Sequence, residues 1–256
     1  MPECRKKAVI TGGSRGIGRG IALVLAKAGY DVAVNYHTAR EEAQSLQEEL
    51  QALGARCFYA QASLEQDGVA GPFMENAIAE LGGLDLLVCN AGVTRWNSLL
   101  TVDEAFINGL YNLNYRSYLI TAGVAARHFV DKNVKGNIIF IASTRGYRAY
   151  PEDCVYGSLK AALIRAVESM ALEMGKYGVR VNCIAPGATA VRGDFTPEEL
   201  TSLPFTKKIP VPRAGTPAEI GYMVEYLASD KAAYITGDTI KIDGGLILPG
   251  IPEGAE

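Results

Sequence analysis

The chain has 256 residues, of which 48% are hydrophobic and 21% are charged, and its formal net charge at pH 7 is −3. These values are ordinary for a soluble globular protein, and they exclude both a disordered chain and a general basic surface for nucleic acid. The five cysteines are odd in number and widely spaced, so neither a disulfide framework nor a metal site is expected. The start of the chain does not resemble a signal peptide, and no apolar run is long enough for a membrane helix, which favours a cytoplasmic location.

Short apolar runs alternate with longer amphipathic runs along the chain. The first half predicts strands at Lys7–Thr11, Asp31–Asn35, Arg56–Ala60 and Asp85–Asn90, separated by helices at Gly16–Gly29, Ala39–Leu53 and Glu65–Leu81. The second half predicts strands at Asn137–Ser143, Arg180–Ala185 and Thr239–Ile242, and helices at Asp103–Asp131, Asp153–Tyr177, Thr196–Leu203 and Pro217–Ser229. Such apolar strands, each followed by a helix, are typical of right-handed βαβ units. The predicted fold is a single Rossmann-type α/β domain over residues 1–256, a doubly wound parallel sheet of about seven strands with helices on both faces.

A glycine-rich turn follows the first predicted strand. Residues 11–18 read TGGSRGIG, with glycines at positions 12, 16 and 18. Glycine lets the backbone turn tightly and approach a pyrophosphate at a helix N-terminus, where the helix dipole favours anions. The spacing departs from the general dinucleotide fingerprint, and the alternative is a plain strand–helix turn. We expect a dinucleotide site here, formed by Gly12, Ser14, Arg15, Gly16, Ile17 and Gly18.

The end of the second predicted strand bears on the identity of the dinucleotide. NAD sites often carry an acid there that binds the ribose 2′-hydroxyl. This strand instead ends in Asn35-Tyr36-His37, and Asp31 stands at its opening. Arg15 in the glycine turn is suited to pair with a 2′-phosphate, although a solvated surface arginine is the alternative. The sequence therefore favours NADP(H) over NAD(H).

Polar residues cluster where the later strands end. Ser143 closes the fifth predicted strand, and residues 90–92 (NAG) close the fourth. Tyr156 and Lys160 stand four residues apart on a predicted helix and therefore share one face. Active sites of parallel α/β sheets form at the carboxyl ends of the strands. Ser143, Tyr156 and Lys160 are therefore the candidate catalytic residues.

With these motifs the chain resembles the short-chain dehydrogenase/reductase family over its whole length. The matching pieces occur in family order: TGGSRGIG at 11–18, NAG at 90–92, Asn114, Ser143, YGSLK at 156–160, PG at 186–187 and IDGG at 242–245. The 3-oxoacyl reductase and glucose 1-dehydrogenase branches are the most similar. The resemblance implies an oxidoreductase that interconverts a secondary alcohol and a ketone by hydride transfer with NADP(H) or NAD(H).

The resemblance also implies a role for each matching residue. Tyr156 would be the general acid–base, Lys160 would favour its ionised form and hold the nicotinamide ribose, and Ser143 would hydrogen-bond the substrate oxygen. Asn114 would hold a water that links Lys160 to solvent, with Asn112 as an alternative. The other implied cofactor contacts are Asn35, Tyr36, His37, Ser63, Leu64, Asn90, Ala91, Gly92, Pro186, Gly187 and Thr189.

Three positions depart from the family pattern. Cys89 replaces an asparagine, Ser63 replaces an aspartate that contacts adenine, and Val191 replaces a threonine for which Thr189 is a substitute. These departures predict altered cofactor affinity and not loss of activity.

The substrate is expected between the segments that follow the fourth, fifth and sixth strands, under a loop over residues 188–215. Candidate substrate contacts there are Arg95, Arg145, Tyr150 and Arg192. Arginine forks favour a polar or anionic substrate, and solvated rim or subunit-interface arginines are the alternative. A sugar or polyol, a 3-oxoacyl thioester and a hydroxysteroid all remain open. Acyl-carrier reductases of the family have docking arginines near the places where this chain has Val134 and Tyr177. This difference argues against a carrier protein as a partner.

A second functional class is a non-catalytic protein that senses or regulates through the dinucleotide. The intact set of Ser143, Tyr156, Lys160 and Asn114 argues against it, because a sensor has no use for that set. The two long helices have apolar residues on too many sides for one solvated face, which favours a homo-oligomer, either a tetramer or a dimer. Neither a nucleic acid nor a membrane is expected as a partner.

Overall fold

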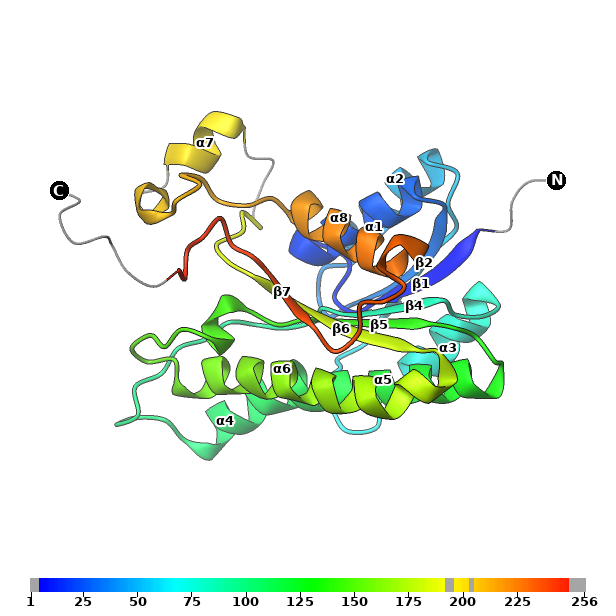
Figure 1. Ribbon diagram of the computed structural model, residues 1–256, viewed down its shortest axis with the longest axis horizontal. Helices are drawn as coiled ribbons and strands as arrows, with labels where there is room; N and C mark the ends of the chain where they lie inside the picture. Colours follow the sequence, from blue (N-terminus) through cyan, green and yellow to red (C-terminus); the bar gives the residue numbers. More distant parts are fainter. Residues whose placement is uncertain (1–4, 192–195, 203–204, 249–256) are drawn as a thin grey trace.

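Seven parallel strands form one sheet at the centre of the molecule (Figure 1). The computed structural model describes residues 5–191, 196–202 and 205–248. The strands are β1 (Lys6–Ile10), β2 (Tyr30–Tyr36), β3 (Cys57–Gln61), β4 (Leu86–Cys89), β5 (Asn137–Ile141), β6 (Arg180–Pro186) and β7 (Thr239–Ile242), in the spatial order β3-β2-β1-β4-β5-β6-β7. In register, Val9 of β1 lies between Ala33 of β2 and Leu87 of β4. This order is that of a doubly wound dinucleotide-binding sheet, so the predicted fold class is confirmed.

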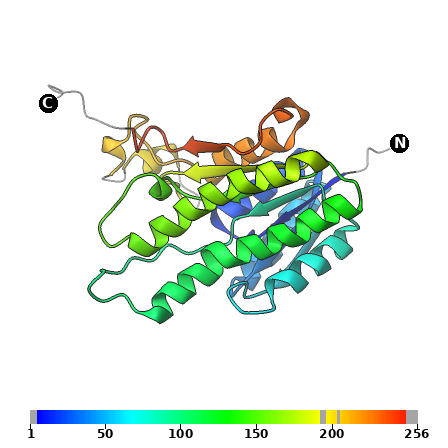
Figure 2. The ribbon, with the colours of Figure 1, turned by 60° about the horizontal axis from the view of Figure 1, so that its bottom comes forward.

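Helices cover both faces of the sheet (Figures 1 and 2). One face carries α1 (Gly16–Lys27), α2 (Arg40–Ala52) and α8 (Pro217–Ala228), and the other carries α3 (Ala70–Leu81), α4 (Glu104–Tyr111), α5 (Ser117–Asp131) and α6 (Cys154–Met174). Each face has its own buried cluster, and alternate strand residues enter opposite ones. Val9 joins the cluster under α3, α5 and α6, whereas Ile10 joins the cluster under α1 and α8. This two-sided burial explains why the strands are apolar throughout.

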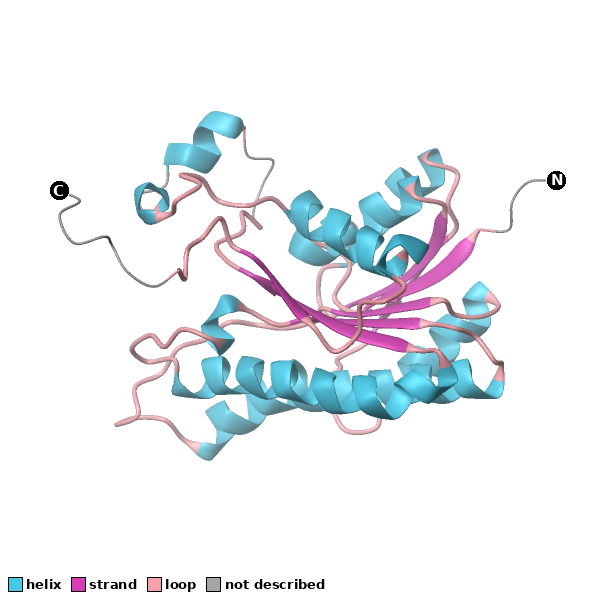
Figure 3. Cartoon of the chain, in the orientation of Figure 1, coloured by secondary structure: helices cyan, strands magenta, loops and turns pink. Residues whose placement is uncertain are grey.

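The loops that follow β4, β5 and β6 leave the sheet at the same end, at the left in Figure 1 and as pink segments in Figure 3. The short helix α7 (Pro197–Ser202) lies at this end, and single 3₁₀ turns occur at η2 (Thr144–Gly146), η3 (Gly175–Tyr177), η4 (Thr206–Lys208) and η5 (Asp230–Ala232). The chain runs outward from β1 to β3 and then returns to place β4 beside β1. Ligands bind such sheets in the crevice where the strand order reverses, outside the carboxyl ends of the strands.

The largest differences from the predicted helices occur in two places. The helix expected over Glu65–Leu81 begins only at Ala70, after a turn in which Gly68 has a left-handed φ of 75°. The helix expected over Asp103–Asp131 is divided into α4 and α5 by the π-helical turn η1 (Asn112–Arg116). Turns of this kind occur inside α-helices frequently at functional sites. Here the turn contains Asn114.

Candidate active site

The glycine turn between β1 and α1 lies against the end of β4. Gly12 and Gly16 have left-handed φ angles of 64° and 56°. A Cβ atom at Gly12 would lie 2.8 Å from the Cα atom of Ala91, and one at Gly18 would lie 2.3 Å from the carbonyl oxygen of Gly12. At the start of α1, Arg15 provides no side-chain cap and the first turn has no acidic residue. The first N–H groups of α1 are therefore available to an anion, and this backbone fits a dinucleotide pyrophosphate.

The amide side chains of the buried Asn35 and the half-buried Asn90 hold this turn in place from opposite sides. Asn35 is only 4% exposed, and its Oδ1 accepts a hydrogen bond from the Gly12 N–H at 2.8 Å while its Nδ2 donates to the Ala62 carbonyl at 2.9 Å. Asn90 donates from Nδ2 to the carbonyls of Thr11 and Gly12, at 2.9 and 3.1 Å. The side chain of Asn35, predicted to contact the cofactor, is thus engaged within the protein. An asparagine at the end of a buried strand beside a glycine turn was the available signal, because a buried amide needs partners.

We expect Asn35→Leu to destabilise the protein and weaken dinucleotide binding together. The variant leaves the Gly12 N–H and the Ala62 carbonyl buried without partners, at a cost of about 1–3 kcal/mol for each group. Thermal unfolding and calorimetric titration with NADPH measure the two effects. The control is Asn76→Leu, the same substitution at an exposed position on α3. An Asn35→Leu protein that unfolds and binds as the wild type does would contradict the assigned role.

Tyr156 and Lys160 lie on α6 with their side chains buried, at 8% and 3% exposure. The Lys160 Nζ donates to the Ile141 carbonyl at the end of β5, 3.0 Å away, and lies 5.6 Å from the centre of the Tyr156 ring. Ser143 follows β5, and its Oγ accepts a hydrogen bond from the Arg145 backbone N–H at 3.2 Å. The fold therefore brings the three predicted catalytic residues to the carboxyl end of the sheet.

Burial shifts Tyr156 and Lys160 of α6 toward their neutral forms. Burial raises the pKa of Tyr156, although hydrogen bonding to the hydroxyls of Thr94 and Ser143 opposes this rise. Burial also lowers the pKa of Lys160 to about 8. A positive charge introduced beside Tyr156, such as that of an oxidised nicotinamide, would favour the tyrosinate. The site is thus suited to a tyrosine that keeps its proton until a ligand binds.

Asn114 is fully buried in the π-helical turn η1, whereas Asn112 is half-buried. The Asn114 Nδ2 donates to the carbonyls of Val93 and Leu110, each at 3.2 Å. Its Oδ1 is buried and accepts no hydrogen bond within the described residues. A Cβ atom at Gly92 would lie 2.6 Å from that Oδ1, so the glycine of the NAG motif is what leaves room for this amide.

The segment after β6 crosses the glycine turn. A Cβ atom at Gly16 would lie 3.4 Å from Cβ of Val191, and the Thr189 Oγ1 is 3.4 Å from the Gly187 carbonyl to which it donates. A Cβ atom at Gly187 would lie 2.6 Å from Cβ of Asp243, so this glycine permits contact with the IDGG motif. Of the other predicted cofactor residues, the buried ones are Ser14, Gly18, Tyr36, Leu64, Ala91 and Pro186, the half-buried ones are Ile17 and Ser63, and the exposed ones are Arg15 and His37.

Among the predicted substrate residues that the structure describes, Arg145 has partners within the protein. Arg145 is bound within the protein, because its Nη1 forms an ion pair with Oδ2 of Asp153 at 2.9 Å. Its guanidinium also lies 4.3 Å from the ring centre of Tyr150 and 5.2 Å from that of Trp96. Arg95 is exposed, and Arg192 lies outside the described residues. Sequence reasoning missed Asp153, although an acid three residues before Tyr156 was a visible signal.

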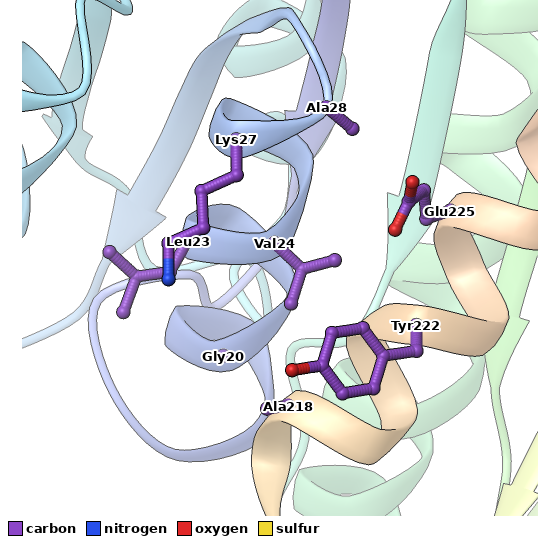
Figure 4. Close-up of a pocket in the computed structure, with 8 residues that line it drawn as sticks. All are labelled: Gly20, Leu23, Val24, Lys27, Ala28, Ala218, Tyr222 and Glu225. Carbon is purple, nitrogen blue, oxygen red and sulfur yellow. The ribbon is translucent and has the colours of Figure 1, made fainter.

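A separate groove of about 270 Å³ lies between α1 and α8, on the face of the sheet opposite α6 (Figure 4). Gly20, Leu23, Tyr222 and Glu225 are among its lining residues, and none of the candidate catalytic residues belongs to it. A Cβ atom at Gly20 would lie 2.4 Å from Cβ of Pro217, and one at Gly221 would lie 2.9 Å from Cγ2 of Val24, so glycines let the two helices pack closely beside the groove. The groove therefore follows from helix packing.

Two further features are absent from the described ranges. None of the helices there has the length and apolar character needed to cross a bilayer. The same ranges contain no group of three or more His, Cys, Asp and Glu residues that could hold a metal ion.

The fold and this site define a dinucleotide-binding oxidoreductase, and comparisons with known proteins agree. The family described as "Enoyl-(Acyl carrier protein) reductase" matches residues 12–247. The 3-oxoacyl-[acyl-carrier-protein] reductase FabG of Staphylococcus aureus is 36% identical over 244 residues, which cover 95% of this chain and 98% of the relative. The short chain dehydrogenase mdpC of Emericella nidulans is 34% identical over 254 residues, with 94% of each chain covered. The crystal structure of acetoin dehydrogenase YohF from Salmonella typhimurium has a TM-score of 0.89 at 30% identity, over 96% of this chain and 98% of that one.

The chain therefore belongs to the short-chain dehydrogenase/reductase family. The family predicted from the sequence is confirmed, as is its 3-oxoacyl reductase branch. The protein is an oxidoreductase of the kind that acts on CH–OH and ketone groups.

Proposed function

We propose that this protein interconverts a secondary alcohol and a ketone of a small molecule with NADP(H), and that Tyr156 is its acid–base. The observation that carries the proposal is the burial of Tyr156 and Lys160 together beside Ser143, at the end of the sheet where the glycine turn offers free N–H groups. A protein that only sensed the dinucleotide would need the turn but not a buried tyrosine–lysine pair.

Each residue has a distinct task in this mechanism. The bound dinucleotide supplies or accepts the hydride. In reduction, Tyr156 gives its hydroxyl proton to the carbonyl oxygen, and in oxidation it removes that proton. The Ser143 hydroxyl hydrogen-bonds the same oxygen as charge develops on it. Lys160 stabilises the tyrosinate, and the buried, unpaired Oδ1 of Asn114 is suited to hold a water that connects Lys160 with solvent.

The surroundings of the glycine turn support NADP(H) over NAD(H). No carboxylate stands among the last residues of β2, and Asn35 is occupied in holding Gly12. Arg15 is exposed at the turn, whereas Arg19 is held by Glu49 at 2.6 Å. Arg15 is therefore the cation we assign to the 2′-phosphate.

Among substrate classes we place 3-oxoacyl thioesters first. The name of the Staphylococcus aureus relative, a 3-oxoacyl-[acyl-carrier-protein] reductase, supports this choice. A sugar or polyol and a hydroxysteroid are the alternatives. We also propose that residues 1–256 act as one domain and that residues 188–215 cover the substrate.

The outer surface of the long helices supports assembly into a homo-oligomer, either a tetramer or a dimer. Leu172 on α6 is 86% exposed, and Ile107, Tyr111 and Ile120 on α4 and α5 are also exposed. Apolar side chains grouped on neighbouring helices are typical of a subunit contact. We propose a cytoplasmic enzyme with a small-molecule substrate and no nucleic-acid or membrane partner.

The function is tested by assaying a panel of ketones and 3-oxoacyl thioesters with NADPH and with NADH. We expect turnover with NADPH, a lower kcat/KM with NADH, and a smaller difference between the two cofactors in Arg15→Ala. Lys27→Ala provides the control, because Lys27 is exposed at the other end of α1. Dinucleotide binding without turnover of any carbonyl compound would support the sensing function instead.

A further inference from the structure

The Arg145–Asp153 ion pair joins the two segments that carry the catalytic residues. Arg145 comes two residues after Ser143, whose Oγ accepts a hydrogen bond from its backbone N–H. Asp153 comes immediately before α6 and three residues before Tyr156. The pair closes at 2.9 Å between Nη1 and Oδ2. It therefore connects the start of α6, which carries Tyr156, with the turn η2 that directly follows Ser143.

This ion pair is largely buried. The Asp153 side chain is only 2% exposed, and the Arg145 side chain is 25% exposed under the rings of Trp96 and Tyr150. The first turn of α6 packs directly against the pair at Gly157. A Cβ atom there would lie 3.0 Å from the Arg145 carbonyl oxygen and 3.1 Å from the Asp153 Oδ2.

Removing one member of such a pair leaves the other member buried without its partner, which is costly. The Asp153 Oδ1 is buried and has no hydrogen-bond partner within the described part of the chain. Without Arg145 the buried carboxyl group would lack both its ion-pair partner and a hydrogen bond at Oδ1. Without Asp153 the positive charge of the guanidinium would be left unbalanced near Tyr156. The interaction of charges in a water-poor site is strong compared with that on a surface.

We propose that Arg145 and Asp153 form a positioning pair that fixes Ser143 relative to Tyr156 and balances the charge around the Tyr156 hydroxyl. This inference rests on the proposed function only for its kinetic consequence. The charge balance itself is a property of the folded protein.

Several other polar and titratable groups lie around Tyr156 and Lys160. The ammonium of Lys160 lies one turn further along α6, and the ring of Tyr118 on α5 also faces Lys160, at 5.2 Å from Nζ. Thr94, after β4, and Ser143, after β5, place hydroxyls at Tyr156. The strand thiols Cys89 and Cys183 face Lys160. Among these, Asp153 and Arg145 have opposite effects: the carboxylate raises the pKa of Tyr156 and the guanidinium lowers it.

The test is a double-mutant cycle that consists of Asp153→Asn, Arg145→Met and the double variant. Titration of Tyr156 is followed by tyrosinate absorbance, as the difference between each protein and the same protein carrying Tyr156→Phe. Asp153→Asn removes the negative charge, so the titration is expected to move to lower pH. Arg145→Met removes the positive charge, so the titration is expected to move to higher pH. The double variant is expected to titrate close to the wild type.

The pH profile of kcat for ketone reduction is the second readout, and its basic limb is expected to move in the same opposite directions. Arg148→Met is the matched control, because Arg148 also lies near the Tyr150 ring, at 5.7 Å, but donates to the Leu246 carbonyl. Arg145→Lys keeps the charge with poorer geometry, so it should lower kcat without moving the limb.

The proposed charge balance would be overturned if the Tyr156 titration moved in the same direction in both single variants, or if it moved in neither. It would also be overturned if both single variants failed to fold and the double variant did not restore folding. These outcomes are distinct from a failure of the proposed function. An enzyme without carbonyl turnover would still give the two opposite Tyr156 titrations if the pair acts as proposed.

Discussion

Tyr156→Phe is expected to lower kcat for ketone reduction by about 10²- to 10⁴-fold, which is the usual contribution of a positioned acid–base. The variant removes a single oxygen atom and leaves a buried ring in place beside Lys160. The carbonyl oxygen would then lack a proton donor, while the glycine turn that binds the pyrophosphate is unchanged. The affinity for NADPH should therefore be close to that of the wild type.

Steady-state kinetics on the best carbonyl substrate, together with calorimetric titration of NADPH, separates the two effects. Tyr147→Phe is the matched control, since Tyr147 belongs to the loop after β5 but is 47% exposed. Retention of most of the wild-type kcat by Tyr156→Phe would remove Tyr156 from the mechanism. Loss of NADPH binding in parallel with kcat would instead indicate a structural defect.

Lys160→Met is expected to abolish turnover and at the same time to stabilise the free protein. Burial lowers the pKa of Lys160 from 10.5 to about 8, which at about 1.4 kcal/mol per pH unit disfavours the folded state by roughly 3 kcal/mol below pH 8. Methionine fills a similar volume without a charge. The Ile141 carbonyl keeps a partner, because the Tyr118 hydroxyl also donates to it, at 3.2 Å. A rise in Tm of several degrees at neutral pH follows from a free-energy difference of this size.

The stability difference between the wild type and Lys160→Met is expected to depend on pH in a defined direction. Between pH 10.5 and about 8, the unfolded chain binds a proton at Lys160 that the folded protein does not. The wild type therefore loses stability relative to Lys160→Met as the pH falls through this range, and the difference is constant at lower pH. Thermal unfolding at several pH values between 7 and 10 measures it. The exposed Lys27→Met provides the control, and a Tm difference that does not change with pH would contradict the depressed pKa of Lys160.

The layers of the fold could be predicted because each strand is buried on both faces. Val9 and Ile10 enter opposite buried clusters, so both positions must be apolar, and the alternation of such runs with helices determines a parallel sheet. Helix ends were harder to predict, because they depend on single backbone angles. The start of α3 is delayed to Ala70 after the left-handed Gly68. The hydrophobic spacing of the sequence contains no information on that angle.

The candidate site shows a similar division. Residue types and spacing place Ser143, Tyr156 and Lys160 together, because strand ends and helix faces are fixed by the topology. The residue pattern could not show which polar side chains are already bound by other groups of the protein. Asn35 is bound to Gly12, and Arg145 is bound to Asp153, through contacts that join distant parts of the chain or depend on loop geometry.

The π-helical turn at Asn112–Arg116 also constrains how this chain can change in length. A π turn closes hydrogen bonds from each residue to the fifth one along, so it holds one residue more than an α-helical turn. The apolar faces of α4 and α5 are consequently out of phase with each other by that residue. Deleting one residue here would make the helix regular, but it would rotate either Asn114 away from Val93 or the whole of α5 away from its buried cluster. The length of this segment is therefore fixed on both sides, unlike that of the exposed loop before it.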